Sequence, residues 1–171
     1  KPTAAPDACS PWPIHRLDSG TTGVLVVGKT GRSIRDLSEQ FQKKTVQKTY
    51  YAIAIGRMPN SGSIDSPIDD KQAFTSYEVE KALPSPRFDQ LNLVKLYPVT
   101  GRRHQIRKHL AEIGHPILGD KDYGLEGLIL TGKGIYLHAF QIEFTHPDNG
   151  QKVRFTSALP KKYLKIFPNQ Y

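Results

Sequence analysis

Six short runs of apolar, aromatic and β-branched residues, separated by glycine, proline and asparagine clusters, restrict this chain to a fold built mainly of β-strands. The predicted strands are 24–27, 46–55, 74–83, 90–97, 136–144 and 152–158. Asn149-Gly150 is a strong turn signal, so the last two runs are expected to form a hairpin. The first 14 residues contain four prolines and are expected to form an extended loop.

Helical spacing occurs in two places. In 31–42 the apolar residues Ile34, Leu37 and Phe41 recur at intervals of three and four, with Ser33 available as the N-cap. In 103–113 the residues on one face are Ile106, Leu110 and Ile113, and the pattern ends at Gly114 and Pro116. Strands joined by short turns, with few helices, predict a single α+β domain over 1–171, with a mainly antiparallel mixed sheet and flanking helices.

The stretch GVLVVGKT at 23–30 fits the phosphate-loop pattern G-x-x-x-x-G-K-[ST]. A phosphate loop wraps its backbone N–H groups around phosphates, and the strand precedes its first glycine. Here four apolar residues, three of them β-branched, stand between the glycines and predict a buried core strand. We therefore interpret the match as coincidental, and expect this strand to anchor the residues that precede it.

The charge indicates a polyanionic partner. The 24 Lys and Arg residues outnumber the 16 Asp and Glu residues, and five basic residues with no acidic one fall within 95–108. Clustered positive charge favours nucleic acid, although a solvated basic face is the simpler alternative. No run is long and apolar enough for a membrane span and no signal peptide is recognisable. The single Cys9 fits a reducing compartment, so we expect a cytoplasmic protein.

Two polar segments carry the candidate chemistry. In His15-Arg-Leu-Asp18 the aspartate stands at a turn, where a local capping role is the usual alternative to catalysis. The segment 100–110 is expected to place Arg103 and Arg107 on one helical face, four residues apart. A carboxylate near an RNA-facing surface needs a cation to stay ionised, and a guanidinium can hold it with two hydrogen bonds. The two segments therefore make most sense together.

At this point the sequence resembles the RluA-type RNA pseudouridine synthases over nearly its whole length. HRLDSGTTG at 15–23 resembles that family's catalytic motif, and KTYYAIAIG at 48–56 resembles the strand that carries its active-site tyrosine. GRRHQIRKHL at 101–110 followed by GHPILGDKDYG resembles its second signature, and YLHAFQIEFTHP at 136–147 resembles its late strand. The departures are the triplet Thr21-Thr22-Gly23 and Arg103, where the family commonly has a smaller residue.

The resemblance also bears on the ends of the domain. Lys1-Pro2 is similar to the end of the family's first motif, and the strands expected upstream of it are missing from this sequence. So is the small accessory S4-type RNA-binding domain that some members carry. The resemblance thus implies a pseudouridine synthase catalytic domain that lacks its N-terminal strands.

Site residues follow from the matching motif positions. The resemblance implies Asp18 as the essential catalytic aspartate, Tyr50 as the tyrosine that stacks on the target base and helps with proton transfer, and Arg107 as the arginine paired with the aspartate. Tyr51 should point to the opposite face of its strand and serve packing. The residues expected to bind RNA are Arg16, Arg102, Arg103, Lys48 and His104.

The implied reaction is conversion of specific uridines in tRNA or rRNA to pseudouridine, with the target base flipped out of its stack. Asp18 either attacks C1′ or removes the 2′ proton, and the isomerisation requires no cofactor. His104 and His109 are five residues apart, which argues against a shared metal-ligand face on a helix, so no metal is expected. The expected protein is a monomer with RNA as its partner and no membrane association. A catalytically silent RNA-binding protein of the same fold is the alternative.

Overall fold

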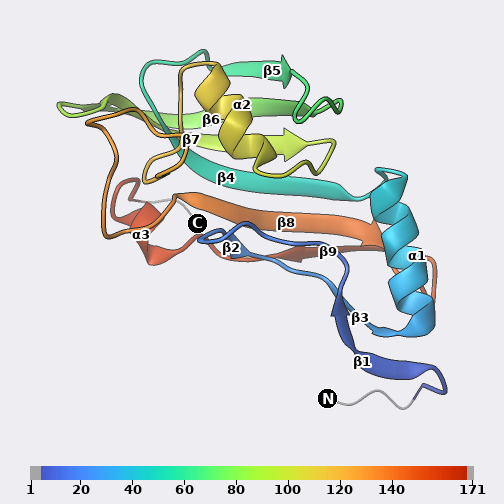
Figure 1. The fold of residues 1–171 in the computed structure, drawn as a ribbon. Helices are drawn as coiled ribbons and strands as arrows, with labels where there is room; N and C mark the ends of the chain where they lie inside the picture. The colour runs from blue at the N-terminus through green and yellow to red at the C-terminus, as the bar shows by residue number, and fades with distance from the viewer. Residues whose placement is uncertain (1–4, 169–171) are drawn as a thin grey trace.

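The computed structural model describes residues 5–168, and these contain a seven-stranded main sheet with β4 (Gln47–Ile55) near its middle (Figure 1). Next to β4 lies β7 (Asp89–Pro98), followed by β6 (Phe74–Ser85) and, at the edge, β5 (Ser61–Asp65). All of these neighbours pair antiparallel. β6 and β7 form a long hairpin that starts at the pair Thr75 and Pro98 and ends at the pair Ser85 and Asp89.

On the other side of β4 lies β8 (Leu137–Thr145). The remaining partners of β8 are β2 (Thr22–Gly23) near its start and β9 (Lys152–Thr156) towards its end. The pair β2 and β8 is parallel, whereas β4 and β9 both run antiparallel to β8. The predicted α+β class with a mainly antiparallel mixed sheet is therefore confirmed. β5 was not expected, because its serine and glycine residues have little strand propensity.

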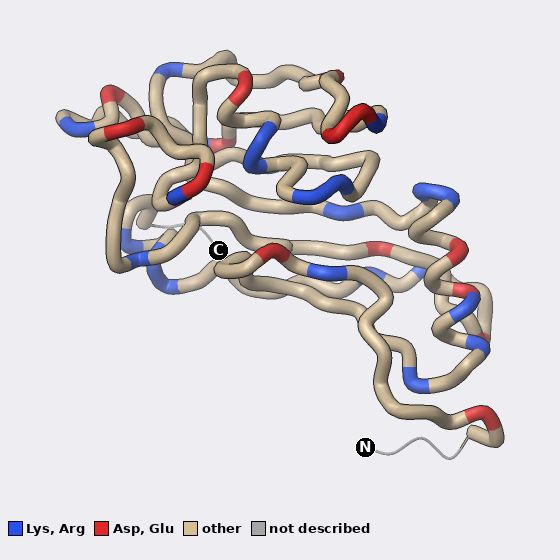
Figure 2. Tube along the Cα trace, in the orientation of Figure 1, with Lys and Arg blue, Asp and Glu red and all other residues tan. Residues whose placement is uncertain are grey.

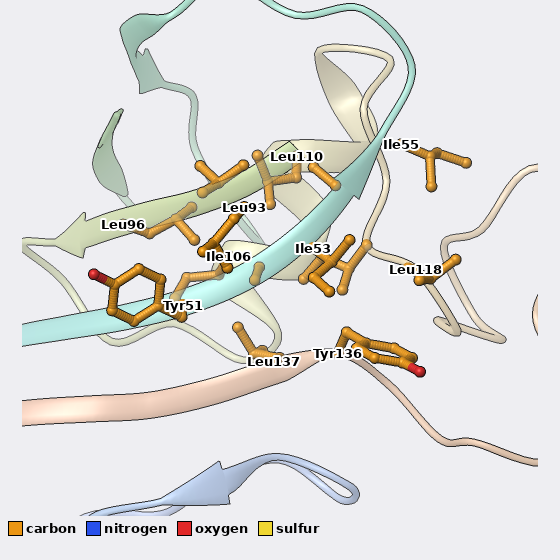
Figure 3. Packing of buried hydrophobic residues seen from close by; sticks show 14 of the residues in the cluster. Tyr51, Ile53, Ile55, Leu93, Leu96, Ile106, Leu110, Leu118, Tyr136 and Leu137 are labelled. Carbon is orange, nitrogen blue, oxygen red and sulfur yellow. The ribbon is translucent and has the colours of Figure 1, made fainter. Parts of the chain in front are cut away.

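The main core lies around β4, where the five consecutive residues 51–55 are all buried (Figure 3). Tyr51 and Ile53 are fully buried, and each buried apolar side chain of this size contributes about 1.5–3 kcal/mol. The helix α2 (Gln105–Glu112) adds Ile106 and Leu110 to the same cluster, as its periodicity predicted. Tyr51 is a packing residue, as expected, and its hydroxyl donates to Glu80 at 2.6 Å.

A smaller two-stranded sheet lies at one end of the molecule (Figure 1). It pairs β1 (Ala8–Pro13) with β3 (Val27–Thr30). The expected loop over the first 14 residues is therefore wrong for β1, whose prolines are tolerated because the strand is exposed and at an edge. The pair Lys1-Pro2 lies outside the described residues.

The helix α1 (Gly31–Gln42) follows β3 directly and packs on β8 through Leu37. Its bounds agree with the prediction, but its N-cap is Thr30 rather than Ser33. The Thr30 hydroxyl accepts from the Ser33 N–H, and the Ser33 hydroxyl accepts from the Thr30 N–H, which is a capping box. The short helix α3 (Lys161–Leu164) was not predicted, because four residues show no periodicity. None of the helices within residues 5–168 is long and apolar enough to cross a membrane.

The predicted core strand 24–27 is wrong in part. β2 ends at Gly23 and β3 begins at Val27, so 24–26 form the link between two sheets. Val24 and Val26 pack against the cluster around Leu37, but Leu25 and Val27 are 45% and 44% exposed. Only Val24 and Val26 therefore attach this segment to the rest of the protein by packing.

Candidate active site

Three segments that are distant in sequence meet at one cavity of about 310 Å³. They are the turn that contains Asp18, the first half of β4, and the connection from β7 to α2. Asp18 and Tyr50 both line this cavity, which we call the Asp18 cavity. Its volume lies at the small end of the range of roughly 300–1,000 Å³ for ligand pockets. The structure therefore brings together the two residues that the sequence pointed to most strongly.

Asp18 is held by the turn that leads into β2. The Thr21 N–H donates to the Asp18 carbonyl at 2.9 Å, and Gly20 between them has a φ of +83°. Immediately afterwards the Thr22 hydroxyl bonds to Nδ1 of His138 on β8 at 2.8 Å. Nε2 of His138 lies 3.0 Å from the Ser157 carbonyl, so the ring donates there and accepts from Thr22. The turn is thus attached to the central sheet within four residues of the carboxylate.

Tyr50 reaches the cavity from β4, on the same strand face as Lys48 and opposite to Tyr51. The pairing of β4 with β8 shifts between Thr49 and Tyr50, where Phe140 is the extra residue of a β-bulge. Bulges of this kind bend a sheet locally and are frequent beside active sites. Burial, with a smaller contribution from the charge of Asp18, raises the pKa of Tyr50 to about 12. Its phenol therefore stays protonated at neutral pH and can donate a hydrogen bond.

Four basic residues line the same cavity: Arg16, Lys48, Arg102 and Arg103. In Figure 2 Lys and Arg positions appear on β4, on the connection between β7 and α2, and on the segment before β2. The Lys48 ammonium donates to the Thr100 carbonyl at 3.0 Å, and burial lowers the pKa of Lys48 to about 8. Basic residues therefore line the same cavity as the Asp18 carboxylate, but Arg107, the predicted partner, is not among them.

Arg107 is not paired with Asp18, which corrects the sequence prediction. Its Nε and Nη2 donate to both oxygens of Asp120 at 2.7 and 2.6 Å, and Nη2 also donates to Asp122 at 2.6 Å. The hydrogen bonds with Asp120 are the main cause of a raised pKa of Arg107. α2 begins only at Gln105, so Arg103 precedes the helix and does not share a helical face with Arg107. Arg107 does not line the Asp18 cavity.

The side chain that lies next to the carboxylate is that of His104. Its Nε2 is 4.0 Å from Oδ1 of Asp18, and its Nδ1 is 3.0 Å from the Tyr123 hydroxyl. The sequence predicted an RNA contact for His104 and assigned no role to Asp120 or Tyr123. The signal that could have identified them is their position in a polar cluster, Asp120-Lys-Asp-Tyr123, directly after the buried residues Ile117 and Leu118.

The segment 23–30 does not form a phosphate loop. The Val24 N–H donates to the Ala139 carbonyl at 2.9 Å, and the Val26 N–H donates to Nε2 of His15 at 3.0 Å. Because these N–H groups already have partners within the protein, they are not available to surround phosphates. Among the described residues there is no cluster of three His, Cys, Asp or Glu side chains arranged to hold a metal ion.

The chemistry available in the Asp18 cavity follows from these groups. A carboxylate with cationic neighbours can act as a nucleophile or a base, and a protonated phenol can act as an acid or hydrogen-bond donor. The surrounding arginines and Lys48 suit an anionic substrate larger than the cavity itself. An aromatic ring beside basic residues is the combination that single-stranded nucleic acids require.

Known proteins are similar to this chain over most of its length. The family described as RNA pseudouridylate synthase matches residues 2–112. Ribosomal large subunit pseudouridine synthase D of Nitrosomonas europaea is 37% identical over 168 residues, covering 86% of this chain and 47% of that protein. tRNA pseudouridine synthase C of Haemophilus ducreyi is 36% identical over 187 residues, covering 94% of this chain and 76% of that protein.

Solved structures agree in fold. Human RNA Pseudouridylate Synthase Domain Containing 1 superposes with a TM-score of 0.76 at 25% sequence identity, covering 87% of this chain and 69% of that chain. Human RNA Pseudouridylate Synthase Domain Containing 4 superposes with a TM-score of 0.74. The chain spans about half the length of several curated relatives that it matches, between 47% and 53%.

Proposed function

Because the chain belongs to the RNA pseudouridylate synthase family, we propose that it isomerises uridine to pseudouridine in RNA. The reaction breaks the bond between N1 of the base and C1′ of the ribose and forms a bond between C5 and C1′. The proton on C5 is released, and N1 takes up a proton. All atoms of the nucleotide are otherwise conserved and no oxidation state changes, so the chemistry requires no redox cofactor.

The observation that carries this proposal is that Asp18 and Tyr50 line one small cavity. We assign to Asp18 the attack on C1′ or the removal of the 2′ proton, and either route requires its ionised form. We assign to Tyr50 stacking on the target base and help with proton transfer, for which the raised pKa keeps its hydroxyl protonated. A single carboxylate suffices, unlike the pair in ordinary glycosidases, because no water has to be activated.

The cation that accompanies the Asp18 carboxylate is, in our proposal, supplied by the basic residues of its own cavity rather than by Arg107. Arg102 and Lys48 are the candidates, because both line the cavity and both are partly buried. Partial burial strengthens their interaction with a nearby carboxylate compared with fully exposed cations. Arg107 serves the site in a different way, because its guanidinium is occupied by Asp120 and Asp122.

The RNA is proposed to lie across the mouth of the cavity with its phosphates against Arg16, Arg102, Arg103 and Lys48. The target nucleotide must leave its stack to reach Asp18, which is least costly in loops or at weak pairs. The relatives carry names that refer to ribosomal large subunit RNA or to tRNA, and either class fits a surface that reads shape and charge. A cytoplasmic monomer remains our prediction.

Nucleoside analysis tests this proposal. The purified chain is incubated separately with unmodified ribosomal RNA and tRNA transcripts, which are then digested and separated by chromatography. We expect pseudouridine to accumulate in one of the two classes. RNA binding without any pseudouridine in either class would contradict the proposal and favour a catalytically silent RNA-binding protein of the same fold.

A further inference from the structure

A chain of contacts connects the ion pair of Arg107 to the catalytic carboxylate. Asp120 is 1% exposed, and its two carboxylate oxygens each accept one bond from Arg107. Its Oδ1 also accepts from the backbone N–H groups of Asp122 and Tyr123 at 3.0 and 3.2 Å. The Arg107 guanidinium also lies over the Tyr123 ring, at 4.9 Å from its centroid. Tyr123 is therefore held at both its backbone and its ring by the same buried ion pair.

Tyr123 in turn holds His104. The two rings meet edge to face at a centroid distance of 5.7 Å, and the Tyr123 hydroxyl lies 3.0 Å from Nδ1 of His104. The other ring nitrogen, Nε2, faces Oδ1 of Asp18 at 4.0 Å. The side chains of His104 and Asp18 are only 15% and 19% exposed, so water competes little with this contact.

The strained backbone conformation of His104 supports a functional role for this residue. It has φ 55° and ψ 27°, the left-handed conformation, directly before the first residue of α2. For a residue with a side chain this conformation costs roughly 1–2 kcal/mol. Strain of this kind persists where the surroundings over-determine it, and it is frequent in active sites. The imidazole of this strained residue lies beside Asp18.

The tautomer follows from the two partners of the ring. An ionised carboxylate can only accept hydrogen bonds, so the nitrogen that faces Asp18 must carry the proton in the neutral ring. Nδ1 is then an acceptor, and the Tyr123 hydroxyl is the donor that it requires. The 4.0 Å separation is longer than a hydrogen bond, as is common in catalytic sites before the substrate is bound.

On this basis, and resting on the function proposed above, we propose that His104 is a positioning residue that orients the Asp18 carboxylate through Nε2–H, with Tyr123 selecting its tautomer and the Arg107–Asp120 pair holding Tyr123 in place. This assignment replaces the RNA contact expected for His104. It also gives Arg107 a role in the site that requires no contact with Asp18.

Two conservative variants of His104 separate the possible roles. In His104→Gln the amide nitrogen reaches the position of Nε2, so the donor toward Asp18 is kept. In His104→Asn the amide nitrogen reaches only the position of Nδ1, but asparagine tolerates the left-handed backbone better than most residues. His104→Ala removes both ring nitrogens, the donor and the acceptor. The readouts are kcat and KM of each variant on the RNA identified as substrate.

A positioning role predicts a definite order. We expect kcat to fall about 10- to 100-fold in His104→Ala and His104→Asn, with partial recovery in His104→Gln, because a misplaced catalytic group costs rates of this size. KM should change less than about threefold. If His104→Asn recovered more activity than His104→Gln, the residue would act only through its backbone. If KM rose while kcat stayed unchanged, His104 would bind RNA, and the proposal would be wrong in both cases.

Tyr123→Phe tests the second step and keeps the ring that lies under Arg107. In the wild-type background this change should lower kcat severalfold. In the His104→Gln background it should cause no further loss of kcat, because glutamine has no tautomer to select. Equal losses in both backgrounds would show that Tyr123 acts independently and would overturn this step.

A measurement without turnover distinguishes failure of this proposal from failure of the proposed function. Nitrogen-15 NMR of histidine-labelled protein, at a pH where the ring is neutral, reports which nitrogen carries the proton. We expect the Nε2–H form for His104, and a weaker preference in Tyr123→Phe. A dominant Nδ1–H form in the wild type would overturn the proposal even if the enzyme were active, and the Nε2–H form would support the arrangement even if no pseudouridine were formed.

Discussion

Three side chains at or near the Asp18 cavity differ from their ordinary behaviour because of what surrounds them. Tyr50 stays protonated because burial raises its pKa to about 12. Lys48 is easily deprotonated because burial lowers its pKa to about 8. Arg107, which the sequence placed in the catalytic centre, is fully engaged by Asp120 and Asp122. Residue type alone therefore does not decide the role of these groups, and their neighbours do.

Lys48 provides a prediction about pH. Since its pKa is about 8, the free protein carries a charged ammonium at pH 7 and a largely neutral amine at about pH 9 and above. A phosphate is attracted only to the charged form, so RNA affinity should fall as the pH rises through about 8. The dissociation constant for RNA, measured in an Asp18→Ala background to prevent turnover, should therefore increase between about pH 7 and pH 9.

The matched control is Lys48→Arg, because a guanidinium stays charged over this whole range. Its affinity should depend much less on pH than that of the parent protein. If both proteins lost affinity equally, another group would be responsible and Lys48 would not contact the RNA.

Among the structural elements, the short strand β2 decides where the turn that contains Asp18 lies. It pairs with β8 only through Thr22 and Gly23. Gly23 has a φ of +119°, and a Cβ at this position would overlap the Ala139 backbone of β8. Only glycine allows the chain to approach the sheet this closely, five residues after Asp18.

We therefore expect Gly23→Ala to lower both stability and turnover. The overlap and the unfavourable φ should cost at least about 1–3 kcal/mol in the free energy of unfolding, and displacement of Asp18 should reduce turnover by about 100-fold. Denaturant unfolding and the rate of pseudouridine formation are the measurements.

Gly150→Ala is the control for Gly23→Ala. Gly150 also has a positive φ, +69°, but a Cβ there would meet nothing within 4 Å. It should lose about 1 kcal/mol of stability at unchanged turnover. Full activity in a folded Gly23→Ala protein would show that the β2 pairing does not position the turn that contains Asp18.

Much of the element order could be predicted from the sequence, because runs such as 46–55 and 136–144 combine apolar alternation with clear turn signals. β5 and α3 could not, since short polar segments acquire their structure from the neighbours they pair with. The link at 24–26 was misread because an apolar run rich in valine has strand propensity whether or not it finds a pairing partner.

The candidate site was predictable in part. Asp18 and Tyr50 lie in motifs that indicate them as candidate site residues, and both line one cavity in the structure. The partner of Arg107 could not be predicted, because spacing along a helix says nothing about which loop will face it. The place of His104 beside Asp18 could not be predicted for a related reason, since its left-handed backbone is invisible in the sequence.

At the scale of the whole molecule, four cations line the Asp18 cavity, where β4, the turn that contains Asp18 and the connection from β7 to α2 meet. If each neutralises one phosphate of single-stranded RNA, the logarithm of the binding constant should fall with the logarithm of salt concentration with a slope of about −3. Arg102→Ala should reduce the size of this slope by about 0.7. Arg57→Ala is the control, because Arg57 follows the far end of β4 and pairs with Asp89; an equal change there would argue against localised binding.

The most direct test of the catalytic role of the Asp18 cavity is release of tritium from RNA labelled at C5 of uridine, since the proton on C5 must leave when the new bond to C1′ is formed. The wild type and Asp18→Ala are compared, with RNA affinity measured alongside. We predict release by the wild type only, with the affinity of Asp18→Ala within about tenfold of the wild type because phosphate contacts dominate binding. Equal release by both proteins, or binding without release by the wild type, would contradict the assignment of this cavity as a uridine-isomerising site.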